Sequence, residues 1–168
     1  LSWTCSPLKN SDFQQKGTPM PTLDDIRACF SGDRYATETT GVFIQEAQPG
    51  ASVCTLPLRP ELLNANGTPM GGAIFTLADF AFAVAVNSHS QAVTVSQHAS
   101  VTFLSPAKGQ TLIARASCLK AGRQTCLYAV DITDELGTYV AHVTVNGFTL
   151  AVPPKPLMPL EGEKAPEA

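Results

Sequence analysis

One stretch of the sequence restricts the possible folds more than any other. Residues 71–86 begin with two glycines and continue as an apolar run that contains one ionisable side chain, Asp79. A helix on the surface of a globular protein usually has charged residues along one face, and this stretch has none. It is also too short for a membrane-spanning helix, which needs about 20 uninterrupted apolar residues. The stretch therefore predicts a helix that does not span a membrane and is buried by other parts of the protein.

Asp79 is the unusual residue of this predicted helix. A carboxylate in apolar surroundings is destabilising unless it is paired, hydrogen-bonded or neutralised. One interpretation is structural, with Asp79 bonding a buried backbone N–H group, and the other is catalytic. The preceding residues 64–70 favour catalysis, because this turn-forming segment brings bare glycine amides to a helix N-terminus. Such amides can bind an anion or an oxyanion.

Composition limits the range of functions. The 168 residues, of which 44% are hydrophobic, suffice for one domain with a sizeable core. The net charge of −3 argues against a nucleic-acid partner, which would require a basic stripe. The N-terminus lacks the basic start and apolar run of a secretory signal, so we expect a cytoplasmic protein. The five cysteines include no C-x-x-C motif, so we expect neither a metal site nor a complete disulfide framework.

Periodicity and turn residues predict the other elements. We expect a short helix, two strands, the long helix and four more strands, at 22–30, 37–46, 51–58, 71–86, 93–103, 110–119, 125–133 and 138–150. The tight loops favour an α+β fold, with an antiparallel sheet of five or six strands curled around one buried helix. Residues 1–21 are expected to form a flexible arm, 22–152 the domain, and 153–168 a proline-rich disordered tail.

Two expectations concern side-chain directions in these strands. Alternation in the strand at 93–103 places Gln97 among the apolar residues of one face and Ser96 on the opposite face. In the hairpin formed by the next two strands, Cys118 and Cys126 are expected to lie opposite each other. In a cytoplasmic protein we expect these two cysteines to be reduced.

Several motifs together resemble a known family. They are Asn64-x-x-Gly67-Thr68-x-x-Gly71-Gly72, Leu77-x-Asp79, Asn87-Ser88, Val101-x-Phe103-Leu104-x-Pro106, Lys120-x-Gly122-Arg123 and Asp131-Ile132. Over residues 35–150 the sequence resembles the hotdog-fold acyl-CoA thioesterases, in particular the phenylacetate-pathway type. The resemblance implies a sheet wrapped around a central helix, an acyl-CoA substrate, and a homodimer that often pairs into a dimer of dimers. It implies no metal or redox cofactor.

The resemblance also implies roles for single residues. Asp79 matches the family's helix carboxylate, which acts as nucleophile or general base. Gly71 matches the amide that polarises the thioester carbonyl, and Asn64 matches the loop residue that orients water or substrate. Ser96 falls where relatives keep a polar residue near that water. Further residues expected to contact the substrate are Gly72, Met70, Gln97 and Arg123.

The family pattern differs at one position, because Met70 replaces the histidine that normally precedes the two glycines. A thioether can pack but cannot donate a hydrogen bond, so the glycine amides would be held less rigidly if the imidazole fixes this loop. The sequence therefore leaves two functions open. One is hydrolysis of an acyl-CoA with a small, medium or aromatic acyl group, and the other is a non-catalytic acyl-CoA-binding module. A dehydratase ranks last, since it would need that histidine.

Spacing along the helix predicts how many chains build the site. Gly71 and Asp79 are eight positions apart in the sequence, which corresponds to about 12 Å along one helix. A single thioester carbonyl cannot contact both groups of the same helix. If both groups serve one reaction centre, they must come from two copies of the chain, with the helices packed near a two-fold axis.

Overall fold

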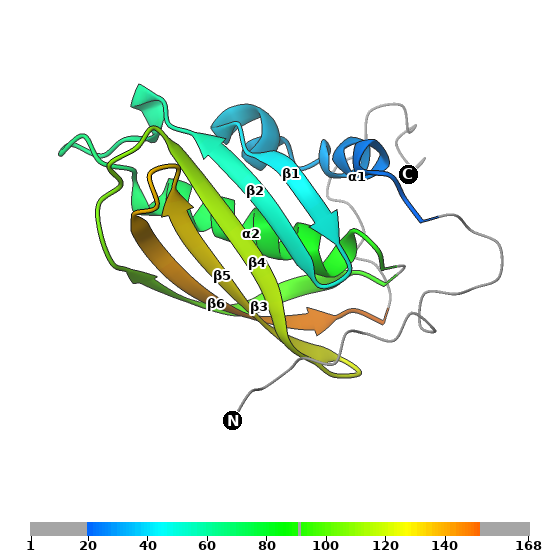
Figure 1. Ribbon diagram of the computed structural model, residues 1–168. Coiled ribbons are helices and arrows are strands. Elements are labelled where there is room, and N and C mark those ends of the chain that lie inside the picture. Colours follow the sequence, from blue (N-terminus) through cyan, green and yellow to red (C-terminus); the bar gives the residue numbers. More distant parts are fainter. Residues whose placement is uncertain (1–19, 91, 152–168) are drawn as a thin grey trace, which may run out of the picture.

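The computed structural model describes residues 20–90 and 92–151 (Figure 1). The expected arm at 1–21 and tail at 153–168 lie almost wholly outside this range, so both stay predictions. The elements are α1 (Leu23–Phe30), η2 (Tyr35–Thr40), β1 (Phe43–Gln48), β2 (Ala51–Pro57), η3 (Pro60–Leu62), α2 (Gly71–Asn87), β3 (Thr94–Phe103), β4 (Thr111–Ala121), β5 (Thr125–Asp134) and β6 (Tyr139–Thr149).

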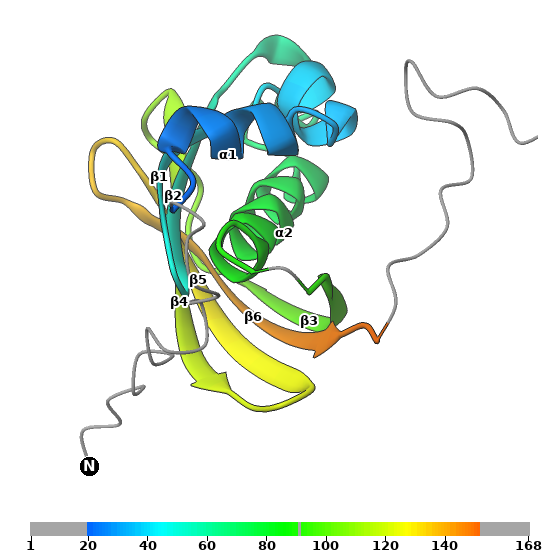
Figure 2. The same cartoon turned by 90° about the vertical axis from the view of Figure 1, so that its right-hand side faces the viewer.

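The six strands form one antiparallel sheet in the order β1-β2-β4-β5-β6-β3. Short loops join β1 to β2, β4 to β5 and β5 to β6, as the turn residues predict. The chain runs through α2 between β2 and β3, which places β3 at the edge of the sheet beside β6. The sheet curls around α2 (Figure 2). The predicted α+β class, with up to six strands around one long helix, is confirmed.

The core lies between α2 and the concave face of the sheet. Nine of the 17 residues of α2 are buried, and Leu77, Ala78 and Ala81 are fully inaccessible to solvent. Burial of each large apolar side chain contributes roughly 1.5–3 kcal/mol. Phe82 packs edge-on against Tyr128 of β5, with ring centroids 5.3 Å apart. In the part of the chain that the structure describes, no helix has the length and apolar character needed to cross a bilayer.

One stripe of α2 remains uncovered in the single chain, which the all-round apolar sequence did not predict. Gly72, Phe75, Thr76, Asp79 and Ala83 are exposed or half-buried, and they recur every three or four residues along one face. Figure 2 shows the sheet beside α2 and α1 above it, with no described element on the remaining side. The prediction of an enclosed helix is therefore wrong for one chain by itself.

The predicted strand at 37–46 is half helical. Residues Tyr35–Thr40 form a π-helical turn, and β1 begins only at Phe43. The buried Thr40 hydroxyl donates a hydrogen bond to the Ala36 carbonyl at 2.6 Å, and Gly41 ends the turn with φ of 84°. The β-branched residues of this segment favour a strand, but the burial of Ala36 and the back-bonding of Thr40 stabilise the turn instead.

A bulge at Gln97 reverses an expected side-chain direction in β3. The pairing of β3 with β6 shifts between Ser96 and His98, so Gln97 is the extra residue. Ser96 pairs with Gly147, which is buried close to the Phe82 ring of α2. Ser96 therefore lies on the helix-facing side of the sheet, although it remains exposed. The alternation had placed it on the opposite face.

A second register shift corrects the expected cysteine pair. The pairing of β4 with β5 shifts between Cys118 and Lys120. As a result Cys118 pairs with Tyr128, and Cys126 pairs with Ala121. The two cysteines are not opposite each other, and no disulfide joins the described cysteines.

Candidate active site

The first half of the predicted site is the N-terminus of α2. Met70 is the N-cap residue, and its side chain makes no capping hydrogen bond. Among the described residues, the N–H of Gly71 has no hydrogen-bond partner. The Met70 N–H donates to the Leu62 carbonyl at 2.8 Å, and the Asn64 N–H donates to the Thr68 carbonyl at 2.8 Å. Backbone hydrogen bonds thus hold this corner without help from the side chain at position 70.

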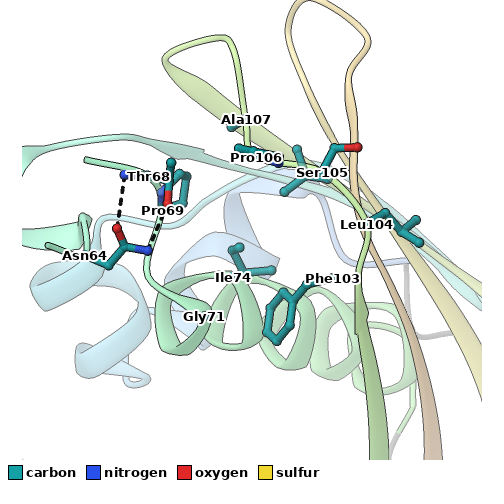
Figure 3. A pocket seen from close by; sticks show the side chains of 11 residues that line it. Asn64, Thr68, Pro69, Gly71, Ile74, Phe103, Leu104, Ser105, Pro106 and Ala107 are labelled. Carbon is teal, nitrogen blue, oxygen red and sulfur yellow. Dashed lines mark hydrogen bonds between the residues drawn. The ribbon is translucent and has the colours of Figure 1, made fainter. Parts of the chain in front are cut away.

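Asn64 uses its side chain mainly within its own loop. Its Oδ1 accepts hydrogen bonds from the N–H groups of Asn66 at 2.9 Å and Thr68 at 3.2 Å. Its Nδ2 donates to the Thr68 hydroxyl at 2.8 Å (Figure 3). These bonds are those of an Asx turn, which rigidifies the loop that leads to the glycines. Asn64 therefore has a structural role whatever else it contacts.

Asn64 and Gly71 line a hollow of about 440 Å³ between the start of α2 and the end of β3, which we call the Gly71 hollow (Figure 3). Its walls are mostly apolar and include Ile74, Phe103 and Leu104. A Cβ atom at position 71 would lie 3.0 Å from the Phe103 ring, so the glycine permits the close approach of this ring. The hollow places an apolar wall beside uncapped backbone amides.

The second half of the predicted site lies further along α2. Asp79 is half-buried in the open stripe and lines a separate hollow of about 420 Å³, the Asp79 hollow, with Asp33, Arg34 and Tyr35. Among the described residues, the Asp79 carboxyl has no hydrogen-bond or ion-pair partner. The two hollows share no lining residue. One chain thus holds its amides and its carboxylate in two separate places, as the spacing along the helix predicts.

Asp33 was missed by the sequence analysis. It lies just after α1, in a Ser-Gly-Asp turn that indicates only the end of a helix. Burial, and then the charge of Asp79, raise the pKa of the Asp33 carboxyl above its ordinary value, although its side chain remains exposed. No spacing rule connects two residues so distant in the sequence, and only the fold brings them to one hollow.

Ser96 and Gln97 lie away from the Gly71 hollow of their own chain. The far end of β3 reaches Gly71 through Phe103. The start of β3 lies at the other end of α2, where the Thr94 N–H donates to Asn87 Oδ1 at 2.8 Å. Ser96 and Gln97 follow directly after Thr94, so a single chain does not bring either of them to Gly71.

Arg123 is also separate from both hollows. It is exposed in the turn between β4 and β5. Its neighbours Ala121 and Gly122 line a third hollow of about 140 Å³ with His89, at the C-terminal end of α2. Contact between Arg123 and the predicted substrate therefore stays a prediction.

A further ionisable cluster lies on the outer face of the sheet. The Tyr139 hydroxyl donates to Asp131 Oδ1, and His142 Nδ1 lies 2.7 Å from the same oxygen. The bond to Asp131 raises the pKa of Tyr139 to about 12. Asp131 and His142 pair across β5 and β6 on the side opposite α2, so they are not part of either hollow. In residues 20–90 and 92–151, no group of three His, Cys, Asp or Glu side chains could hold a metal ion.

Sequence comparisons identify relatives of this chain. The model of the thioesterase superfamily matches residues 66–141. A putative esterase from Deinococcus radiodurans is 37% identical over 95 residues, which are 56% of this chain and 64% of that protein, so the chain spans slightly less than two thirds of this relative. Acyl-coenzyme A thioesterase PaaI from Escherichia coli K12 is 34% identical over 118 residues, which are 70% of this chain and 83% of that protein.

Solved structures give the same result. The structure of the E. coli PaaI protein superposes with a TM-score of 0.68 and 27% identity, and the match covers 77% of this chain and 97% of that one. A hypothetical thioesterase from Streptococcus pneumoniae, solved with coenzyme A, gives a TM-score of 0.66 and 27% identity, with 72% and 96% covered. The six-stranded sheet around α2 is the hotdog fold, and the chain belongs to the thioesterase superfamily as a hotdog-fold member of the PaaI type.

Proposed function

We propose that the protein hydrolyses an acyl-CoA thioester to a free acid and coenzyme A, in a site shared by two copies of the chain. The observation that carries this proposal is the separation of the Gly71 amide and the Asp79 carboxyl into two hollows of one helix. In a symmetric dimer that packs the open stripes of α2 together, the amide of one copy can face the carboxyl of the other. Each dimer then has two complete sites.

Two surfaces of the chain support such a homodimer. The open stripe of α2 contains Phe75, which is 37% exposed. The edge strand β3 exposes Val95 and Phe103, at 39% and 57%. An uncovered edge strand with apolar side chains is prone to pair with another chain. A further pairing into a dimer of dimers, the cytoplasmic location and the lack of a nucleic-acid partner stay predictions.

The proposed mechanism divides the work between the two copies. The Gly71 N–H, helped by Gly72, donates to the thioester carbonyl oxygen and stabilises the oxyanion, a contribution of about 3 kcal/mol per donor. Asp79 of the second copy takes a proton from a water molecule, whose oxygen adds to the carbonyl carbon. The tetrahedral intermediate then collapses, the carbon–sulfur bond breaks, and coenzyme A leaves as a thiolate that is protonated. Asn64 and Ser96 are proposed to orient the water.

The surroundings of Asp79 favour a general base over a nucleophile. The carboxyl is only half-buried and lines a hollow of about 420 Å³, which leaves room for water beside it. A nucleophile would instead need the carbonyl carbon held directly against the carboxylate. We therefore assign Asp79 the role of base.

The substrate class follows from the relatives and from the Gly71 hollow. The S. pneumoniae relative was solved with coenzyme A, and the E. coli relative is an acyl-coenzyme A thioesterase. The mostly apolar wall around Ile74 and Phe103 suits a small, medium or aromatic acyl group. Met70, Gly72, Gln97 and Arg123 are retained as proposed substrate contacts.

A non-catalytic acyl-CoA-binding module is the second candidate function. Its supporting observation is Met70, which stands where the family has histidine and is 54% exposed. Against it stands the hydrogen bond from the Met70 N–H to Leu62, which holds the corner without an imidazole. Hydrolysis therefore remains the first candidate.

The two candidates are separated by measuring thiol release from acetyl-, hexanoyl- and phenylacetyl-CoA, together with binding of a non-hydrolysable thioether analogue. An enzyme releases thiol in a reaction that Asp79→Asn suppresses while the analogue still binds. A binding module retains the analogue but releases no thiol from any of the three thioesters, and that result would refute the hydrolase proposal.

A further inference from the structure

The side chain of Phe103 lies against the glycine whose amide is proposed to bind the substrate. Phe103 is the last residue of β3, and its ring lies beside Ile74 at the start of α2 (Figure 3). A Cβ atom at position 71 would lie 3.0 Å from Cζ of this ring, 3.6 Å from Cε1 and 3.7 Å from Cε2. These are the three atoms at the far edge of the ring, so that edge points at Gly71.

The ring also lies beside the space into which the Gly71 N–H group points. In an α-helix the N–H groups point along the axis towards the N-terminus, and each Cα–Cβ bond is tilted in the same direction. Gly71 is the first residue of α2, so no preceding helical turn fills this space. A carbonyl oxygen that accepts a hydrogen bond from this N–H group therefore lies next to the edge of the Phe103 ring.

The backbone around Phe103 is fixed, while its ring remains open to the Gly71 hollow. Phe103 pairs with Ala141 of β6, and the Leu104 N–H donates to the Val140 carbonyl at 2.9 Å. Ala141 is fully buried, so Phe103 lies on the side of the sheet that faces α2. Its side chain lines the hollow and is largely exposed. The ring thus forms a wall with one free surface, held in place at its base.

Bond lengths indicate which part of a bound acyl group meets this wall. A hydrogen bond from the Gly71 N–H spans about 2.9 Å, the carbonyl bond about 1.2 Å and the next carbon–carbon bond about 1.5 Å. The α-carbon of the acyl group therefore lies within about 6 Å of the Gly71 nitrogen. The ring edge lies equally close to Gly71 and on the same side. Substituents of the α-carbon are thus the first atoms of the acyl group to meet the ring.

We propose that Phe103 is a specificity-determining residue, and that its ring selects acyl groups that are unbranched at the α-carbon. This inference rests on the proposed function, because it takes the Gly71 amide as the group that binds the carbonyl and the Gly71 hollow as the acyl pocket. A CH₂ group fits beside the ring edge, whereas an added methyl group requires the ring to move. The sulfur side of the thioester carries the same unbranched chain in every acyl-CoA, so the ring discriminates through the acyl group.

Two isomeric substrates test the proposal, because butanoyl-CoA and isobutyryl-CoA have the same atoms and differ in branching at the α-carbon. The measured quantity is the ratio of kcat/KM for butanoyl-CoA to that for isobutyryl-CoA. Phe103→Leu removes the ring edge and keeps an apolar side chain, so we expect this ratio to fall about tenfold from that of the unmodified protein. The comparison between proteins cancels the lower intrinsic reactivity of a branched thioester. It also cancels any general loss of active protein.

Two further variants make the kinetic test specific. Phe103→Met keeps an apolar side chain of similar length but replaces the rigid ring with a flexible chain, so the ratio should fall here too, even if Phe103→Leu does not fold. The matched control is Val95→Ala, which truncates another exposed apolar residue of β3 that does not line the Gly71 hollow. Its ratio should equal that of the unmodified protein. An equal fall in Val95→Ala would indicate a general effect of the strand and would overturn the assignment to Phe103.

A binding measurement separates this inference from the proposed function. Ketone analogues of the two substrates, in which a CH₂ group replaces the thioester sulfur, keep the carbonyl but cannot be hydrolysed. Their dissociation constants are measured by calorimetry for the unmodified protein and Phe103→Leu, and the preference for the butanoyl analogue should decrease in the variant. If the unmodified protein releases no thiol, the hydrolase proposal fails, while these constants still test the role of Phe103. If thiol is released and neither the kinetic nor the binding preference changes, the inference is overturned.

Discussion

Asp134 and Asp79 differ in how many hydrogen bonds their carboxylates accept from backbone N–H groups. Asp134 is 2% exposed, and its two carboxyl oxygens accept hydrogen bonds of 2.8–3.1 Å from the N–H groups of Lys108, Gly109, Leu136 and Thr138. Asp79 is half-buried and accepts none from the described residues. The uncapped Gly71 amide of the same chain lies about 12 Å away along the helix, and we propose that Asp79 works instead with the Gly71 amide of the second copy.

The difference distinguishes an acid that stabilises the fold from an acid whose oxygens can accept hydrogen bonds from water or substrate. Burial by itself would raise the pKa of Asp134, but the hydrogen bonds from Lys108, Thr138 and Gly109 outweigh burial and hold this pKa well below its ordinary value. Its bonds join the loop before β4 to the turn after β5, and no acceptor capacity is left for a substrate. Asp79 keeps its full capacity, beside a hollow that is open to water.

The largest expected effect is on activity, from Asp79→Asn. We expect kcat/KM for thiol release to fall by roughly 10²–10⁴-fold, because the amide cannot accept the proton of the attacking water. The melting temperature should stay within about 2 °C, since no described hydrogen bond is lost. If the variant keeps its activity but has a much lower melting temperature, Asp79 stabilises the fold as Asp134 does, and the two acids do not differ in role.

The next effect is expected at the amides, from Gly71→Pro. Proline is well tolerated at the first position of a helix but has no N–H, so kcat should fall by about 10²–10³-fold. Gly71→Ala is the matched control, because it also adds a Cβ atom near the Phe103 ring but keeps the N–H. Equal losses in the two variants would indicate crowding by the side chain and would argue against an oxyanion-binding amide.

Mixing two inactive variants tests whether the halves of the site come from different chains. Gly71→Pro and Asp79→Asn, unfolded together and refolded at equal amounts, should recover about a quarter of the unmodified activity. Half of the randomly formed dimers are mixed, and each of these has one of its two sites intact. Recovery of no activity from a properly refolded mixture would show that both groups act within one chain.

A smaller effect, on stability, is expected from Asp134→Asn. The amide NH₂ group would face backbone N–H groups and leave buried donors unsatisfied, so the melting temperature should fall by roughly 5–10 °C. Because the folded-state pKa of Asp134 is lowered, its stabilisation is present above the unfolded value near 3.9 and is lost as pH falls towards the folded value. The variant should therefore lose less stability than the unmodified protein on acidification below about pH 4.

That variant should keep its activity at temperatures where it is folded. Thermal melting and thiol release measured on the same samples check both statements. Loss of activity in fully folded Asp134→Asn would contradict the separation of structural and available acids.

The smallest effect is expected from Met70→His, which restores the residue that the family normally has. We expect kcat/KM to rise by no more than about threefold, the worth of one modest hydrogen bond. The reason is that the Met70 N–H already holds the corner through the Leu62 carbonyl. A much larger rise would show that this backbone hydrogen bond does not hold the glycine amides rigidly enough, and that Met70 weakens the amide half of the site.

Much of the fold could be predicted because local patterns and burial agree over most of the chain. The long helix was expected at 71–86 and extends from Gly71 to Asn87, and the six strands were expected in their observed sequence order. The prediction of a strand at 37–46 failed only in its first part, where β-branched residues form a π-helical turn that ends at Thr40, and β1 begins at Phe43. The predicted side-chain direction of Ser96 was wrong because of the bulge at Gln97. An extra residue in one strand is visible only in its pairing with a neighbouring strand.

The residues proposed for the site could be recognised from local patterns in the sequence, whereas the contacts around them could not. The two glycines, the turn before them and the single acid of α2 could be recognised because each is a local departure from an otherwise apolar helix. The Asx turn of Asn64 and the backbone bond of Met70 could not, since they depend on how the loop closes. Arg123 was expected to contact the substrate, and no described hollow includes it in a single chain.

The sequence by itself determined that one acid would lie within an apolar helix, eight positions beyond a glycine amide, because composition and helical rise are properties of consecutive residues. The tertiary structure decided which stripe of that helix stays open, which residues line the hollows beside the amide and the acid, and that Asp33 lies beside Asp79. These features depend on packing between residues far apart in the chain, where the direction of each side chain is set by its neighbours in space.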